Sequence, residues 1–304
     1  MSNNSLPPPQ SDQPFFEISA LEAGFMTFRT DIFLEPQPPS LSPSWEGPSL
    51  CFLLRHSATG EYILFDSGFR KSMDQYPPVA QALIQKFFAP VRVSHDAADR
   101  VAEGGLSPSN VSKVIISHAH FDHIGNSSRF PAATYIVGKG THDLAASGYP
   151  TNPDSPYGQD TLPTGRTRVL DPSDASLSWT QIGPFEHALD LLGDGSAYII
   201  DSPGHLPGHI NLLVRTSTDG AWAHFAADSV HDWSLFHGTS VFAAHPDVGC
   251  VHLDKESAVR QVAKLRELAK VPRVRILLAH DVPLWKKARE NDWDGFWPKK
   301  IPSL

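Results

Sequence analysis

Two kinds of apolar run alternate along the chain: short continuous runs typical of buried strands, and longer runs with helical spacing. The runs over 50–55 and 62–66 flank a short Thr-Gly-Glu turn, and this pattern predicts a β-hairpin. Helical spacing predicts one helix over 78–88 and another from an Asp254 cap to Lys270. Their apolar faces are expected to hold Val79, Leu83, Ile84 and Phe87 in the first helix, and Val259, Val262, Leu265 and Leu268 in the second.

Further apolar runs predict short strands that come before, between and after the helices. They lie at 113–117, 134–137, 198–200, 210–215, 221–226 and 273–279, and 139–146 has the pattern of a short helix. This mixed order favours an α/β or α+β fold with helices packed outside a sheet.

Three segments lack such periodicity. Residues 1–13 are polar and Pro-rich, which predicts a disordered tail. The segment 35–48 carries five prolines and reads as an irregular loop, and 147–185 is rich in Gly, Pro, Ser and Asp. A stretch as long as 147–185 is typical of a lid, a binding loop or an insertion. We therefore expect a single domain over 14–304 with a loop insertion at about 147–185.

Composition narrows the class of partner. The formal net charge is −8, which counts against nucleic acid or an anionic membrane, because both attract a basic face. No run approaches the roughly 20 apolar residues of a membrane helix. Two distant cysteines, Cys51 and Cys250, form no disulfide framework and suit reduced thiols in the cytoplasm. A small molecule is the expected partner, and the sequence leaves monomer and homodimer both open.

Candidate chemistry begins directly after the predicted strand 113–117. The sequence there reads His118-Ala119-His120-Phe121-Asp122-His123. Neutral imidazole nitrogen and carboxylate oxygen suit Zn²⁺ and neighbouring divalent ions. A sharp turn after the strand can aim His118 and His120 at one point and Asp122 and His123 at a second. Four ligands do not fill two sites, so further ligands are expected at later strand ends.

Three later strand ends carry suitable side chains. His205 lies in Ser-Pro-Gly-His-Leu-Pro-Gly-His after strand 198–200, Asp228 closes strand 221–226, and His280 closes the last strand. Together with the first motif and with Phe-Asp-Ser-Gly at 65–68, this order resembles the metallo-β-lactamase superfamily over about residues 50–280. The resemblance implies an α+β fold, an αββα sandwich of two mixed sheets flanked by helices, with the site along one edge.

The resemblance also implies a ligand set. His118, His120 and His205 would bind the first metal, Asp122, His123 and His280 the second, and Asp228 would bridge both. Two Zn²⁺ ions are the expected cofactors, with Mn²⁺, Fe²⁺ or Co²⁺ as alternatives. His209 and Asp66 are expected to support the ligands rather than to bind metal. Seven further histidines are interpreted as structural or exposed: His56, His95, His142, His187, His224, His245 and His252.

Within the superfamily, the motifs resemble lactonases that open homoserine-lactone rings. Such lactonases carry a Tyr three residues after the bridging Asp, and this chain has His231 there. His231 could donate the same hydrogen bond or protonate the leaving group, so it joins Asp122 and Asp228 as a candidate catalytic residue. The chain also resembles fungal lactamase-like proteins that open small cyclic amides or carbamates, and the motifs do not separate the two.

The resemblance implies hydrolysis of a cyclic substrate, and a metal pair would supply the attacking water by lowering its pKa towards neutrality. Lactone opening is the leading hypothesis, and a lactam or carbamate is the first alternative. Thioester hydrolysis is a second alternative, although the chain ends about 24 residues after His280. A metal-dependent binding protein without turnover is the non-enzyme alternative.

Overall fold

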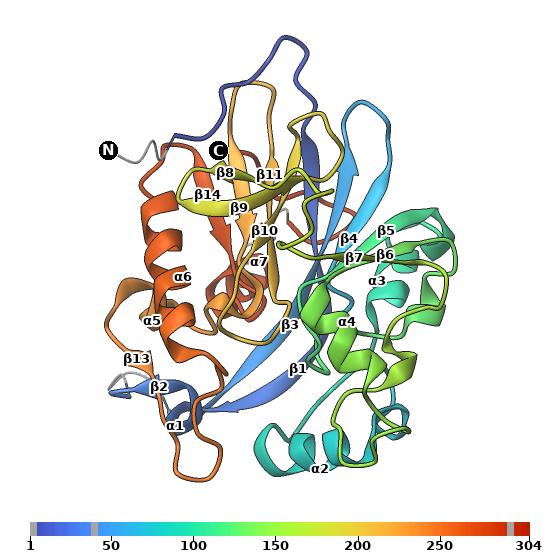
Figure 1. Cartoon of the computed structure of the whole chain (residues 1–304), viewed down its shortest axis with the longest axis vertical. Helices are drawn as coiled ribbons and strands as arrows, with labels where there is room; N and C mark the ends of the chain where they lie inside the picture. Colours follow the sequence, from blue (N-terminus) through green and yellow to red (C-terminus); the bar gives the residue numbers. More distant parts are fainter. Residues whose placement is uncertain (1–4, 38–41, 291–294) are drawn as a thin grey trace.

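The computed structural model describes residues 5–37, 42–290 and 295–304, and it contains two facing six-stranded sheets (Figure 1). The first sheet has the order β1 (Phe16–Arg29), β3 (Ser44–His56), β4 (Tyr62–Phe65), β5 (Val111–Ile116), β6 (Thr134–Gly138) and β7 (Thr167–Leu170). The second has the order β14 (Val274–Leu277), β12 (Trp222–Phe225), β11 (Ile210–Arg215), β10 (Ala197–Asp201), β9 (Phe185–Asp190) and β8 (Thr180–Ile182). A two-stranded ribbon pairs β13 (Val241–Phe242) with β2 (Leu34–Glu35).

Both sheets are mixed. Strands β1, β3 and β4 pair antiparallel, whereas β4, β5, β6 and β7 pair parallel. In the second sheet only β12 and β14 pair parallel. The α-helices are α1 (Thr30–Phe33), α2 (Pro78–Phe87), α3 (Ala97–Glu103), α4 (Lys139–Ala146), α5 (Trp233–His237), α6 (Lys255–Leu268) and α7 (Val282–Glu290). The expected αββα sandwich of two mixed sheets is confirmed.

The core follows from strands that are buried on both faces. Along β3, Leu50, Phe52 and Leu54 face the second sheet, where Phe52 packs against Phe225. The intervening residues Cys51 and Leu53 face outward, under α2 and α3. Successive side chains of a strand point to opposite faces, so a continuous apolar run is what a strand covered on both sides requires.

Helices cover the two outer faces. Helix α6 packs on the second sheet through Val262, Leu265 and Leu268, and α2 and α3 pack on the first sheet. In Figure 1, α5 and α6 lie on one side of the molecule and α2, α3 and α4 on the other. Among the described residues, no helix has the length and apolarity to cross a bilayer.

Most predicted elements lie where the pattern placed them, but two helix faces differ from expectation. Leu83 of α2 is 39% exposed and Val259 of α6 is 52% exposed, so neither belongs to the core. Ala80 and Ala258 occupy the buried positions instead. A small residue allows a helix to approach its sheet closely, and a scan for large apolar residues does not find it.

All three segments expected to be irregular are partly ordered, and residues 44–48 of the segment 35–48 form the start of β3. The stretch 147–185 supplies the edge strands β7 and β8, one to each sheet. At the N-terminus, residues 1–4 lie outside the described part, but the carbonyls of Pro7 and Pro8 accept hydrogen bonds from Arg215 and Gln13 is buried. This anchoring differs from the predicted disorder over 1–13. The extent of the single domain, 14–304, stays a prediction.

Candidate metal centre

A tight turn after β5 presents the first ligands. The backbone N–H of His123 donates to the carbonyl of His120 at 3.0 Å, which closes the turn. Gly125 follows with a φ of +50°, and a Cβ there would lie 2.4 Å from the Ser67 side chain. Glycine is therefore required where the turn passes the loop after β4.

The turn and three later strand ends bring all seven predicted metal ligands into two groups. His118, His120, His205 and Asp228 form one group, and Asp122, His123 and His280 form the other. Within each group the potential ligand atoms all lie within 4.8 Å of one another. All of these side chains are buried except His120, which is half-buried.

Asp228 lies between the two groups, with one carboxylate oxygen facing each. Its Oδ2 is 3.4 Å from His205 Nε2 and 3.5 Å from His118 Nε2, both in the first group. Its Oδ1 is 3.2 Å from His280 Nε2 and 3.3 Å from His123 Nε2, both in the second. This is the arrangement that a bridging carboxylate requires.

Hydrogen bonds on the side of the rings away from the metal centre fix which nitrogen of each histidine faces that centre. His123 Nδ1 lies 2.8 Å from Asp66 Oδ2, and His280 Nδ1 lies 2.8 Å from the Pro48 carbonyl. Neither oxygen can donate, so Nδ1 carries a proton in both rings and Nε2 is the nitrogen that faces the metal centre. Ser117 donates to Asp66 and lies 2.9 Å from His118 Nδ1, so it can accept from that ring. Asp66 acts as a support for ligands, as expected.

The inward-facing atoms fit metal ions, because several have no other partner. Buried atoms without a hydrogen bond include Asp122 Oδ2, His123 Nε2, Asp228 Oδ1 and His280 Nε2. Leaving such atoms unpaired in a protein interior costs about 1–3 kcal/mol each. Imidazole nitrogen and carboxylate oxygen are the donors that Zn²⁺ and its neighbours take, so the residues present fit the cofactor that the motifs imply.

Burial and nearby charges shift the pKa values of the histidines in opposite directions in the two groups. Burial lowers the pKa of His120 to about 4 and the pKa of His118 and His205 well below its usual value. Burial also opposes charge on His123, but Asp228, Asp122 and Asp66 raise its pKa well above its usual value. Burial therefore favours the neutral form of the three histidines in the first group, which is the ligand form.

Comparison with known proteins agrees with this geometry. The family model described as the metallo-beta-lactamase superfamily matches residues 44–217. The chain belongs to this superfamily. The expectation of this superfamily and of its fold is thereby confirmed.

The relatives of this superfamily member include fungal enzymes of different size. It is 30% identical to cytochrome P450 monooxygenase mpaDE' of Penicillium brevicompactum over 97% of this chain and 36% of that protein. The chain thus spans little more than a third of that relative. It is 37% identical to gamma-lactamase MBL2 of Gibberella moniliformis over 52% of this chain and 65% of that one.

Among solved structures, an N-acyl homoserine lactone hydrolase is similar in fold. That protein was solved with the product N-hexanoyl-L-homoserine at its catalytic metal centre. The match has a TM-score of 0.69 and 20% sequence identity, and it covers 94% of this chain and 98% of that one. At this identity the match supports the fold of the superfamily.

A cavity of about 320 Å³ opens beside the two ligand groups. Aromatic side chains from separate elements line it, among them Phe28, Phe88 and Phe121, and Tyr157 comes from the 147–185 segment. Of the described residues that line it, the only charged ones are Asp122 and Asp228. We call it the metal-site cavity. Its chemistry suits a small neutral molecule with apolar parts.

The structure places His231 at this cavity and brings one unexpected histidine beside it. His231 lines the cavity, and its Nε2 is 3.2 Å from Asp228 Oδ2. His209 Nδ1 donates to the Ser202 backbone carbonyl at 3.0 Å, in keeping with its expected supporting role. His252, interpreted from sequence as structural or exposed, is buried with its ring centroid 4.9 Å from that of His205. No motif surrounds His252, so the sequence carries no signal for this placement.

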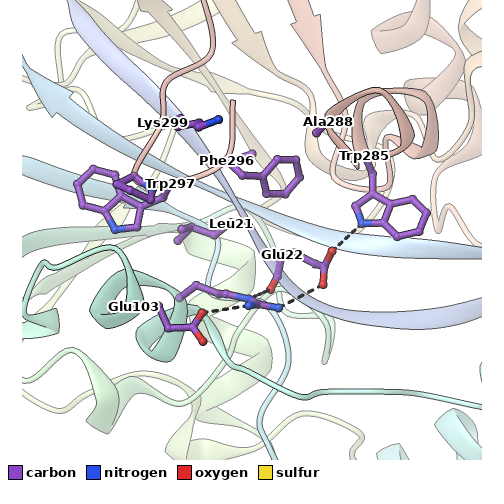
Figure 2. Close-up of a pocket in the computed structure, with 11 residues that line it drawn as sticks. Leu21, Glu22, Glu103, Trp285, Ala288, Phe296, Trp297 and Lys299 are labelled. Atoms are coloured by element: carbon purple, nitrogen blue, oxygen red, sulfur yellow. Dashed lines mark hydrogen bonds and ion pairs between the residues drawn. The ribbon is translucent and has the colours of Figure 1, made fainter. Parts of the chain in front are cut away.

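A second cavity, of about 420 Å³, has different chemistry. We call it the tryptophan cavity because Trp285 and Trp297 line it. Figure 2 shows Trp285 pointing its indole nitrogen at the carboxylate of Glu22, which accepts at 2.6 Å. Glu22 also accepts from Arg100 at 3.2 Å. Glu22 and Arg100 are thus paired with each other, so volume alone does not mark the functional site.

Proposed function

We propose that the protein binds two divalent cations and opens the ring of a small cyclic ester. The observation that carries the proposal is the position of Asp228, whose two oxygens face separate groups of buried ligands. Membership of the metallo-beta-lactamase superfamily and similarity to a lactone hydrolase fold support it.

The proposed ligand assignment follows the two groups. His118, His120 and His205 would hold one cation, Asp122, His123 and His280 the other, and Asp228 would contact both. Zn²⁺ is the first expectation for these donors, and Mn²⁺, Fe²⁺ and Co²⁺ accept similar ligands. When bound, such a pair supplies an activated water and polarises a carbonyl oxygen.

The chain's own residues then handle the proton and exclude water. Asp228 Oδ2 can accept a proton at the edge of the cavity, and His231 lies 3.2 Å from it. His231 is placed to donate a hydrogen bond to the substrate oxygen that becomes negative, or to the oxygen that leaves the ring. The aromatic wall around Phe121 keeps bulk water away from this exchange.

The size and lining of the metal-site cavity favour a small, uncharged ring. A volume near 320 Å³ lies at the lower end of the range of about 300–1,000 Å³ for small-molecule sites. Because no Lys or Arg lies among the described lining residues, an anionic substrate would find no counter-charge there besides the cations.

A cyclic amide is the second candidate substrate. The specific observation in its favour is 37% identity to a gamma-lactamase over 52% of this chain. Ring-opening of an amide needs protonation of a poorer leaving group, so this reaction should depend more strongly on His231 than lactone opening does.

A substrate panel tests the proposal. Purified protein would be assayed on small lactones, lactams and a thioester, before and after removal of metal with a chelator and after re-addition of Zn²⁺. We expect lactone turnover that is lost with the metal and restored by it. Turnover confined to the thioester, or metal binding without any turnover, would contradict the proposal.

A further inference from the structure

His252 lies in the segment between β13 and α6, and backbone pairing fixes it beside His205. Leu253 N–H donates to the His205 carbonyl at 3.0 Å, and Asp254 N–H donates to the Gly204 carbonyl at 2.9 Å. Gly204 has a φ of +137°, and a Cβ there would lie 2.4 Å from the backbone nitrogen of Ala258. The ligand loop and the start of α6 are therefore locked together around His252.

His252 forms a buried triangle of imidazoles with His205 and His231. The ring centroids are 4.9 Å apart for His252 and His205, 5.2 Å for His252 and His231, and 5.0 Å for His205 and His231. Each ring leaves nitrogen atoms without a hydrogen bond: His205 Nδ1, His231 Nδ1 and both nitrogens of His252. Three neighbouring buried rings thus carry polar atoms without a hydrogen bond. Such atoms cost free energy of folding, and a chain of hydrogen bonds among the three rings would remove this cost.

On the sides that face His252, His205 offers a hydrogen-bond donor and His231 offers an acceptor. His231 Nε2 faces a carboxylate oxygen, which only accepts, so Nε2 carries the proton and Nδ1 is an acceptor. His205 Nε2 faces the other first-group ligands, so as a metal ligand it keeps its lone pair there and Nδ1 is a donor. A neutral imidazole offers one donor and one acceptor, which is what a residue between His205 and His231 must supply.

We propose that His252 is a positioning residue that accepts a hydrogen bond from His205 Nδ1 and donates one to His231 Nδ1, directly or through a water. The χ2 torsion of histidine is soft, so the proposal has the His252 ring rotate until its nitrogens face both neighbours. The chain then runs from a metal ligand through His252 and His231 to Asp228. This inference rests on the proposed function, because it takes His205 as a ligand and takes the Nε2–H of His231, which faces Asp228 in the structure, as the group that turns to the substrate oxygen.

Two substitutions separate this role from packing. His252→Phe keeps a ring against Phe242, whose centroid is 3.9 Å away, but removes both the donor and the acceptor. His252→Asn keeps one donor and one acceptor in a smaller side chain. Zn²⁺ affinity would be measured by competition with a chromophoric chelator, together with kcat and KM.

We expect His252→Phe to weaken binding of one Zn²⁺ by about 10–100-fold, the range for lost support of a ligand. Its kcat should fall while KM stays unchanged, because His252 is not among the residues lining the metal-site cavity. His252→Asn should recover most of the affinity. Wild-type affinity and kcat in His252→Phe would overturn the proposal, as would equal losses in both variants.

A buried histidine elsewhere provides the matched control. His56 is also buried, and it contacts Asp194 at the far end of β3 from the metal centre. His56→Asn should lower stability without changing Zn²⁺ affinity. If it changed the affinity as much as His252→Phe does, the effect would be general destabilisation and the proposal would fail.

Nuclear magnetic resonance of wild-type protein with ¹⁵N-labelled histidine tests the same chain without any variant or turnover. Two-bond ¹H–¹⁵N correlations show which ring nitrogen carries the proton. In Zn²⁺-loaded protein we expect the proton on Nδ1 of His205, on Nε2 of His231, and on a single nitrogen of His252. A proton on Nδ1 of His231, or a His252 that exchanges between tautomers, would overturn the proposal. Failure of every ring substrate would instead count against the proposed function alone, because these proton positions do not depend on turnover.

Discussion

The metal-site cavity and the tryptophan cavity differ in how their polar atoms are satisfied. The tryptophan cavity is the larger, at about 420 Å³ against about 320 Å³. No described residue lining it has a buried side-chain nitrogen or oxygen without a partner, whereas Asp122, His205, Asp228 and His231 of the metal-site cavity all do. Unsatisfied buried atoms, rather than cavity size, distinguish a place where a ligand belongs from a gap between packed elements.

Among the substitutions that test this comparison, Asp228→Ala should have the largest effect on activity. It removes the carboxylate that faces both ligand groups of the metal centre. We expect kcat/KM on the preferred substrate to fall on the order of 1000-fold, the scale on which removing one preorganised charge acts. The protein should stay folded, since the substitution also removes a charge from a buried cluster. Steady-state kinetics with circular dichroism checks both parts, and activity within tenfold of wild type (about 1.4 kcal/mol) would refute the assigned role.

Asp66→Ala should have the next largest effect, although Asp66 faces away from the cavity. It removes the acceptor that orients His123 at 2.8 Å, and loss of such support lowers metal affinity by about 10–100-fold. Zn²⁺ competition titration measures the change. Asp66→Asn, which can still accept a hydrogen bond, serves as the matched control and should lose less affinity. Equal affinities in Asp66→Ala and wild type would show that His123 needs no support.

Glu22→Ala tests the other side of the comparison. It leaves the Trp285 N–H and the Arg100 guanidinium of the tryptophan cavity without this carboxylate. We expect the free energy of unfolding to fall by about 1–3 kcal/mol, with kcat, KM and metal content unchanged. Urea denaturation and kinetics are the measurements. A lost activity at full metal content would mean that the tryptophan cavity takes part in function.

The smallest expected effect concerns His224, a buried imidazole that lines neither cavity. It tests whether an unpaired buried nitrogen outside both cavities affects stability alone. Burial lowers its pKa from 6.5 to about 3, and its Nδ1 has no partner. Because the unfolded chain binds the proton more readily, stability should be full above about pH 6.5 and fall as pH decreases towards the folded pKa. Between about pH 7.5 and about pH 6 this loss should come to about 1 kcal/mol.

The variant His224→Asn isolates this contribution from other titrating groups. Its free energy of unfolding should fall less than that of wild type over the same pH interval, by about that amount. Parallel pH profiles for the two proteins would show that His224 is hydrated or paired in solution. A partnerless nitrogen here would then indicate nothing about ligand sites.

Much of the fold was predictable because the strands are buried on both faces and appear as continuous apolar runs. Strands β5, β6, β11 and helix α4 lie at or within a few residues of the predicted bounds. Strand β1 was not predicted, although Phe16, Ile18 and Ala20 alternate with polar residues. Its register shifts between Glu22 and Phe25, and this irregularity interrupts the alternation along the strand.

The candidate site was predictable to the extent that its residues sit in compact motifs at strand ends. His118 and Asp122 are close in sequence, and His205, Asp228 and His280 each end a recognisable apolar run. His252 was not predictable, because the pairing of Leu253 and Asp254 with the ligand loop joins segments about 50 residues apart. Residues brought together by such non-local backbone pairing leave no local signal in a single sequence.

The account rests on two cations held by one shared carboxylate, and counting metal ions tests this most directly. Metal-free wild-type protein and Asp228→Ala would be titrated with Zn²⁺ and analysed by mass spectrometry under non-denaturing conditions. We predict two tightly bound ions per wild-type chain and weaker binding of both ions in the variant. A wild-type chain that binds at most one ion, or two ions held equally well without Asp228, would contradict the account.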